Sequence, residues 1–119
     1  MKEKMKAMIL NLLKEKRSEG ISFAQIENMF DDNNIDYNGD HIIRSSKYKK
    51  IYYWLNMSDD FSRAIIELRK EDKIEFSECN VIIYLADGKI IKDPLARKAI
   101  EYKEPHWLPV LIKMKEVKI

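Results

Sequence analysis

The sequence predicts a single α+β domain that is mostly helical. Its 119 residues suffice for one hydrophobic core, and chains of this length rarely divide into two domains. Apolar residues make up 45% and charged residues 35% of the chain, with only three Gly and three Pro, a composition typical of compact, helix-rich proteins. Apolar residues recur with the period of a helix up to about residue 72, and with the period of a strand after it. We therefore expect helices first and a small sheet after them.

Two helices are predicted in the first third of the chain. Gly20, a residue type common just past a helix end, follows a helix whose apolar stripe consists of Met5, Met8, Ile9, Leu12 and Leu13. Ser22 is suited to cap a second helix, with Gln25 as its capping-box partner three residues later. The apolar face of this second helix consists of Phe23, Ile26, Met29 and Phe30.

A polar turn and then an extra helix are predicted between residues 33 and 57. Asn38-Gly39, a pair that accepts positive φ, closes the turn. A short helix is expected over residues 46–56 because helical spacing separates Tyr48, Ile51, Tyr52 and Leu55. The next helix begins after the N-cap Ser58 and extends to about residue 72, with an apolar face made by Phe61, Ala64, Ile65 and Leu68.

The remainder of the chain predicts a β-hairpin and a C-terminal extension. Residues 73–77 and 80–85 are rich in β-forming side chains, so we expect them to pair as a tight antiparallel hairpin. Pro94 is expected to open a short helical turn that ends near Ile100. Two prolines exclude a regular helix or central strand across residues 105–119. We divide the chain into a domain over residues 1–86 and an extension over residues 87–119, which either packs on this domain or forms a partner interface.

Helix, capped helix, helix and β-hairpin is the element order of a winged helix. Residues 57–76, MSDDFSRAIIELRKEDKIEF, resemble the third helix of the winged helix-turn-helix superfamily as it enters the wing. The core positions of that family are occupied by Ala64, Ile65, Leu68 and Ile74. The resemblance covers residues 4–86 and departs from the family at residues 33–57, where an extra helix replaces a short turn. It implies DNA binding through the third helix.

Basic residues occur in blocks, although the net charge of the chain is only +2. Residues 41–57 carry four Lys/Arg and no Asp/Glu, and residues 88–119 carry eight Lys/Arg and four Asp/Glu. Residues 58–87 have the opposite excess, with eight acidic and four basic side chains. Such blocks place a basic face on a nearly neutral protein, as phosphate binding requires, but ordinary solvated surface shows the same pattern.

The candidate nucleic-acid-binding residues form three groups. In residues 44–54 cations are interleaved with aromatic rings, a combination that single-strand binding uses, whereas the cations alone would serve a duplex. The alternative is that Tyr48, Tyr52 and Trp54 are core residues, with Tyr53 as the exposed ring. On the predicted third helix, Asp59 and Asp60 repel DNA at the start, which leaves the basic residues further along. The third group follows the wing, where the winged-helix resemblance implies phosphate contacts. Together the candidates are Arg44, Lys47, Lys49, Lys50, Tyr53, Arg63, Arg69, Lys70, Lys89 and Lys92.

Catalysis, metal binding and cofactor binding have no sequence pattern in their favour. Three separated glycines do not form a phosphate loop, and two His with one Cys are too few for a structural zinc site. An EF-hand-like stretch from Asn34 has Ser45 where the calcium loop needs Glu. No Ser or Cys lies in a nucleophile motif. We expect a non-enzymatic protein with no metal, cofactor or small-molecule substrate.

The location is expected to be cytoplasmic, without a membrane partner. The longest apolar run, residues 81–86, is far shorter than the roughly 20 residues that a membrane helix needs. A lone cysteine, Cys79, cannot form an internal disulfide, which suits a reducing compartment.

Two functions from different classes follow from these patterns. The first is a non-enzymatic winged-helix protein that binds duplex or single-stranded DNA, such as a transcriptional regulator acting as a homodimer. The second is an accessory subunit of a mobile-element or phage replication or recombination enzyme, which docks on a larger protein. The tail favours the second function, because Trp is a frequent interface anchor and rigid Pro-flanked segments lose little entropy on binding. The expected partner interface consists of Trp107, Leu108 and Val110, with folding back onto the first helix as the alternative.

Overall fold

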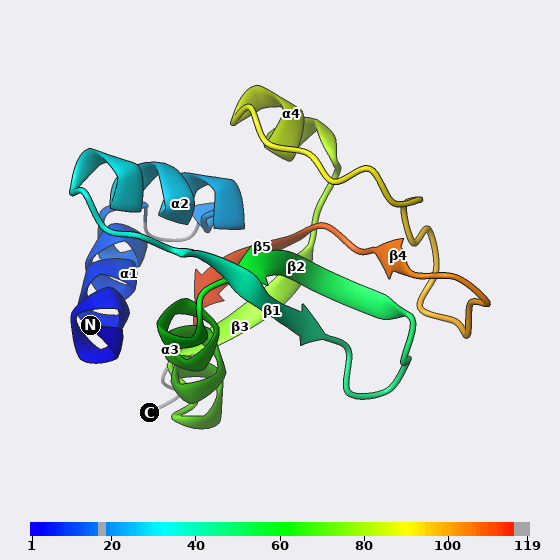
Figure 1. The fold of residues 1–119 in the computed structure, drawn as a ribbon, viewed down its shortest axis with the longest axis horizontal. Coiled ribbons are helices and arrows are strands. Elements are labelled where there is room, and N and C mark those ends of the chain that lie inside the picture. The colour runs from blue at the N-terminus through cyan, green and yellow to red at the C-terminus, as the bar shows by residue number, and fades with distance from the viewer. Residues whose placement is uncertain (17–18, 116–119) are drawn as a thin grey trace.

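A computed structural model describes residues 1–16 and 19–115 and shows an α+β fold in which helices pack around two small sheets (Figure 1). The helices are α1 (Lys2–Lys16), α2 (Phe23–Asp32), α3 (Asp59–Lys70) and α4 (Ile82–Ala86). One sheet has the strand order β1 (Asn38–Arg44), β2 (Ile51–Met57) and β4 (His106–Trp107). The second sheet pairs β3 (Ile74–Glu78) with β5 (Val110–Met114). Within the described ranges, no helix is long and apolar enough to cross a membrane.

The predicted α1, α2 and α3 are confirmed, together with the N-caps of α2 and α3. The α1 stripe buries Met5, Ile9 and Leu13. At the start of α2 the Ser22 hydroxyl accepts the Gln25 N–H, and the Gln25 side chain accepts the Ser22 N–H, which completes a capping box. The Ser58 hydroxyl likewise accepts the Phe61 N–H at the start of α3. Local polar signals therefore define where these helices begin.

The helix predicted over residues 46–56 is wrong, because the segment forms an antiparallel hairpin of β1 and β2. β2 is rich in Ile, Tyr and Trp, residue types that favour strands. Several of its side chains are buried, so its apolar residues occupy consecutive positions instead of alternating ones. Gly39 fits at the base of the hairpin because a Cβ there would lie 2.5 Å from the Met57 carbonyl oxygen.

The predicted hairpin of residues 73–85 is also wrong in its second strand. Residues 82–86 form α4, and β3 pairs with the distant β5. A further bridge joins Ile21 to Ile112, so β5 has a neighbour on each side. The expected helical turn over residues 94–100 is absent from that stretch, where Leu95 instead bridges to Trp107.

The core joins the N-terminal helices to the C-terminal strands through aromatic rings. Phe23 stacks on Trp54, with ring centroids 5.6 Å apart. Trp54 and Tyr84 are 5.3 Å apart, and Tyr84 meets the edge of Trp107 at 5.1 Å. The Tyr84 hydroxyl donates to the Val110 carbonyl oxygen and accepts the Phe23 N–H, and burial raises its pKa. Residues 87–115 thus pack on residues 1–86 and complete a shared core.

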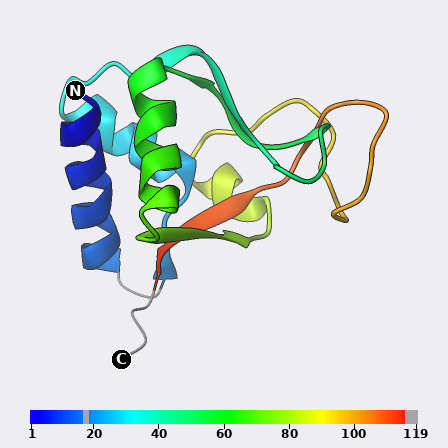
Figure 2. The same ribbon diagram turned by 90° about the horizontal axis from the view of Figure 1, so that it is seen from below.

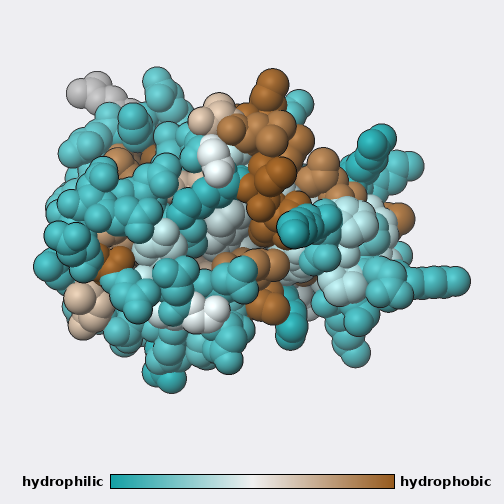
Figure 3. Space-filling model, turned by 45° about the horizontal axis from the view of Figure 1, so that its top comes forward, coloured by the Kyte–Doolittle hydropathy of each residue, from teal (hydrophilic) through white to brown (hydrophobic). Residues whose placement is uncertain are grey.

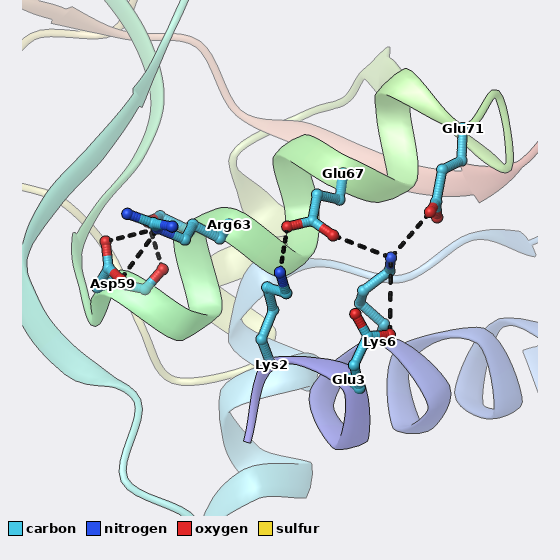
Figure 4. A network of polar contacts seen from close by, with 8 residues as sticks. Lys2, Glu3, Lys6, Asp59, Arg63, Glu67 and Glu71 are labelled. Carbon is cyan, nitrogen blue, oxygen red and sulfur yellow. Dashed lines mark hydrogen bonds and ion pairs between the residues drawn. The ribbon is translucent and has the colours of Figure 1, made fainter.

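An ion-pair cluster holds α1 against α3 (Figure 4). The Lys6 ammonium lies 3.2 Å from one Glu67 oxygen and 3.0 Å from a Glu71 oxygen. Lys2 contacts the other Glu67 oxygen at 2.6 Å. Hydrogen bonds from Lys2 and Lys6 lower the pKa of Glu67, and the hydrogen bond from Lys6 lowers the pKa of Glu71.

We expect this cluster to make the fold sensitive to acid. Because the folded-state pKa values of Glu67 and Glu71 are lowered, the cluster stabilises the fold above their unfolded pKa of about 4.3. That stabilisation is lost as the pH falls through the folded-state pKa values. The double variant Glu67→Gln/Glu71→Gln should therefore lose less thermal stability than the unchanged protein between about pH 5 and pH 3. Melting curves test this, with the exposed pair Glu15→Gln/Glu78→Gln as control; an equal acid dependence in both double variants would contradict it.

Candidate nucleic-acid interface

The turn between β1 and β2, residues 44–50, is shaped by its own hydrogen bonds. The Ser45 hydroxyl accepts the N–H groups of Lys47 and Tyr48 at 3.2 and 3.1 Å. The Ser45 N–H donates to the Ile51 carbonyl oxygen at 2.9 Å, and the Ile51 N–H donates to the Tyr48 carbonyl oxygen at 3.0 Å. Ser45 therefore has a structural role that leaves the basic side chains of the turn free to face solvent. We call residues 44–50 the basic turn.

The basic turn concentrates positive charge. Its four cations, Arg44, Lys47, Lys49 and Lys50, are all exposed. Among the residues that the structure describes, none of the four has an ion-pair partner, and residues 41–57 contain no carboxylate. The Lys47 ammonium lies 5.4 Å from the centre of the half-buried Tyr48 ring. Charges that are exposed and not compensated nearby attract phosphates most effectively.

A second basic segment, residues 92–105, lies beside the basic turn. β4 runs parallel to β2, and the His106 N–H donates to the Lys50 carbonyl oxygen at 2.7 Å. Both ribbon views place the β1–β2 turn and the loop before β4 at the same end of the molecule (Figures 1 and 2). The exposed cations of this segment are Lys92, Arg97, Lys98 and Lys103, against the acidic Asp93, Glu101 and Glu104. We call the two segments together the basic end.

The candidate residues on α3 form a separate group, which lies near Tyr53 on β2. Arg63 is paired with Asp59 at 3.0 Å, so its charge is partly compensated. The Arg69 guanidinium lies 4.2 Å from the centre of the Phe76 ring and 5.9 Å from that of Tyr53. Tyr53 is half-buried, and Lys70 is exposed at the end of the helix. This group combines cations with rings but carries less free charge than the basic end.

Lys89 does not belong to the candidate interface, which corrects the prediction from the sequence. Its ammonium lies 2.8 Å from a Glu27 oxygen and 2.9 Å from the Tyr37 hydroxyl. Burial lowers the pKa of Lys89, but hydrogen bonds to Glu27 and Tyr37 outweigh this and raise it overall. Glu27 is itself buried and also accepts the Trp54 indole N–H at 2.8 Å. Lys89 is therefore part of an internal network.

The tail residues expected to form a partner interface are buried in the chain's own core, which corrects that expectation. Trp107 is 1% exposed, and its indole N–H donates to the Tyr53 carbonyl oxygen at 3.1 Å. Leu108 and Val110 are buried as well. The last four residues of the predicted extension, 116–119, lie outside the described residues. Rigid, apolar residues of this tail thus close the core instead of meeting a partner.

Three surface features were missed by sequence reasoning. A groove of about 540 Å³ is lined by residues of the basic turn and by Asp93 and Pro105 of the second basic segment. The rings of Tyr102 and His106 stack with their centroids 3.8 Å apart, and His106 follows the groove residue Pro105 in the chain. Apolar side chains also gather over α4 and the segment after it, where Ile82, Leu85 and Ile90 are exposed (Figure 3). Only the third feature had a local signal, the apolar run of residues 81–85, and that run was assigned to a strand.

The single cysteine, Cys79, is a poor candidate for a nucleophile. Burial raises the pKa of the Cys79 thiol to about 11, so the thiol remains protonated near neutral pH and is a weak nucleophile. Within the described ranges, no three His, Cys, Asp or Glu side chains gather as metal ligands.

No family model, curated protein or solved structure matches the chain. The geometry of the basic end is therefore the main guide to function.

Proposed function

We propose that the protein binds DNA through the basic end. The observation that carries this proposal is the group of four exposed cations on one hairpin turn, in a stretch of 17 residues without a carboxylate. Cations that neutralise phosphates release condensed counterions, which supplies affinity without any sequence preference. The neighbouring cations of residues 92–105 extend the same surface.

The order of the elements supports a winged-helix reading of the fold. Three helices are followed by an antiparallel strand pair, β3 and β5, and the residue that precedes the α2 cap, Ile21, bridges to β5. In this reading the β1–β2 hairpin is an insertion between the second and third helices, and residues 79–109 are an insertion in the wing. The start of α3 carries Asp59 and Asp60, so we place the main DNA contacts on the inserted hairpin instead of on that helix end.

The second candidate function is an accessory subunit that docks on a larger enzyme, such as one from a mobile element or phage. The tail no longer supports it, because Trp107 is buried. The exposed apolar side chains of Ile82, Leu85 and Ile90 favour it instead, since contiguous apolar surface marks interaction sites. The same surface would serve a homodimer.

We expect charge reversal in the basic turn to weaken DNA binding strongly. Lys49→Glu/Lys50→Glu removes two phosphate contacts and adds two repulsive charges, so the dissociation constant should rise at least about tenfold. The salt dependence of the unchanged protein should be steep, with a slope of log K against log salt near −3 to −4 if four cations contact phosphates. The slope should become shallower by about 1.5 to 2 in the double variant.

Fluorescence anisotropy with labelled oligonucleotides, at several salt concentrations, measures both effects. The matched control is Lys14→Glu/Lys16→Glu, which makes the same charge change on exposed residues of α1. Equal weakening by the two double variants would mean that only net charge matters, and the assignment of the basic end would then be wrong. Affinity that does not change with salt would contradict the proposed function altogether.

A further inference from the structure

The groove beside the basic turn has the size and lining of a site for part of a nucleic acid strand. Its volume is about 540 Å³. Its lining contains three cations, Arg44, Lys49 and Lys50. It also contains the apolar side chains of Ile42, Leu55 and Pro105, together with Tyr52 and Asp93. An adjoining hollow of about 750 Å³ shares Leu55 and Asp93 with the groove and adds Lys92, Asn38 and Asn56.

Hydrogen bonds hold the walls of the groove in place. β4 is hydrogen-bonded to β2 at the edge of the groove, through the His106 N–H to the Lys50 carbonyl oxygen at 2.7 Å. The Tyr52 hydroxyl donates to Asp93 at 2.5 Å and ties the second wall to β2. A groove that is formed before its ligand arrives loses less conformational entropy on binding.

The charges of the groove suit a phosphate chain. Its three cations have no ion-pair partner in the part of the chain that the structure describes. Its one carboxylate, Asp93, already accepts the Tyr52 hydroxyl. The net charge of the lining is therefore +2, which complements a ligand with two or more negative charges.

The apolar part of the lining distinguishes a single strand from a duplex. Ile42 is 38% exposed although it is a large aliphatic side chain, and it lines the groove together with Leu55 and Pro105. Apolar and aromatic surfaces contact the faces of bases, and those faces are accessible only when the bases are neither paired nor stacked on neighbours.

We propose that the groove holds an unpaired nucleotide, so that the preferred ligand of the basic end is single-stranded DNA. This inference rests on the proposed DNA binding and adds the form of the ligand. Arg44, Lys49 and Lys50 contact phosphates, and the face of a base lies on Ile42 and Leu55. Binding in the groove depends on the bases of the strand, whereas simple phosphate attraction does not.

Three labelled probes separate these contributions: a single strand of about 12 nucleotides, a duplex of the same sequence, and an abasic strand of the same length. We expect the single strand to bind at least about tenfold more tightly than either the duplex or the abasic strand, since one stacked base is worth about 1–3 kcal/mol, or roughly 5- to 150-fold. Ile42→Ser should weaken binding of the base-containing strand by about fivefold or more and leave the abasic strand unaffected. The matched control, Ile66→Ser, replaces an isoleucine of 39% exposure on α3 and should change neither affinity.

Two results would overturn the inference in different ways. If the duplex and the abasic strand bind as tightly as the single strand, or Ile42→Ser has no effect, the groove does not hold a base while DNA binding stands. If none of the three probes binds, the proposed function itself is wrong and the inference falls with it. Should Ile42→Ser fail to fold by its melting curve, the comparison of the three probes on the unchanged protein decides alone.

Discussion

Replacement of Trp107 by alanine should lower the free energy of unfolding by about 3–5 kcal/mol. The indole is 1% exposed and lies 5.1 Å from the Tyr84 ring and 6.0 Å from the Trp54 ring, so the variant leaves a cavity beside these two aromatic side chains. The Tyr53 carbonyl oxygen also loses the indole donor at 3.1 Å. Proteins typically have a free energy of unfolding of about 5–15 kcal/mol, so a loss of this size removes a large part of the total stability.

Urea unfolding followed by circular dichroism measures this effect. Ile100→Ala is the control on the same C-terminal segment, because Ile100 is 48% exposed and its truncation should change stability by less than about 0.5 kcal/mol. If Trp107→Ala has an unchanged urea midpoint, Trp107 does not belong to the core. A docking role for this residue, as first expected from the sequence, would then return.

Replacement of Glu27 by alanine should destabilise the fold by about 2–4 kcal/mol. The variant leaves the Lys89 ammonium and the Trp54 indole N–H without the acceptors that they have at 2.8 Å. The expected loss lies below the full cost of breaking a buried ion pair, because the Lys89 side chain is 28% exposed and water partly replaces its partner. The Tyr37 hydroxyl, 2.9 Å from the Lys89 ammonium, remains as a hydrogen-bond partner in the variant and further reduces the expected loss of stability.

A graded pair of variants separates the hydrogen bond from the charge at this position. Glu27→Gln keeps one oxygen acceptor and should lose less stability than Glu27→Ala in the same urea experiment. The exposed carboxylate Glu15 on α1 is a suitable control, and Glu15→Ala should be close to neutral. Equal stability of Glu27→Ala and Glu15→Ala would mean that the network around Lys89 does not form in solution.

Helix ends could be predicted from the sequence because their signals are local. The capping box joins Ser22 to Gln25, and the Ser58 cap joins to Phe61, each across three positions of the chain. The apolar stripes of α1 and α3 likewise lie within a few turns. Such short-range patterns survive without knowledge of the tertiary structure.

The strands were predicted only in part, because the pattern of residues 73–77 located β3 but revealed neither its distant partner β5 nor the β1–β2 hairpin. The spacing of Tyr48, Ile51 and Leu55 fits a helix, yet the β2 segment is covered by other elements and carries its apolar residues without a clear period. The run from Val81 to Leu85 fits either a helix or a strand, and β3 takes its partner from residues 110–114 instead. Tertiary contacts decided both cases.

The candidate site, like the fold, was predicted from the sequence only in part. Arg44, Lys47, Lys49 and Lys50 were recognised because the absence of carboxylates between residues 41 and 57 is visible in the sequence. Lys89 was assigned wrongly because Glu27, its partner, lies 62 positions away. The groove was missed because Ile42 and Pro105 come from segments that only the pairing of β2 with β4 brings together.

The position of β5 also determines when the protein can fold during synthesis on the ribosome. β5 lies between Ile21 and β3, so both wait for a partner until residues 110–114 leave the exit tunnel. Until then the aromatic rings of Trp54 and Tyr84 lack the cover of Trp107. Until β5 emerges, the nascent chain therefore exposes apolar surface and an unpaired strand edge, a state that chaperones recognise and that aggregates when they are scarce.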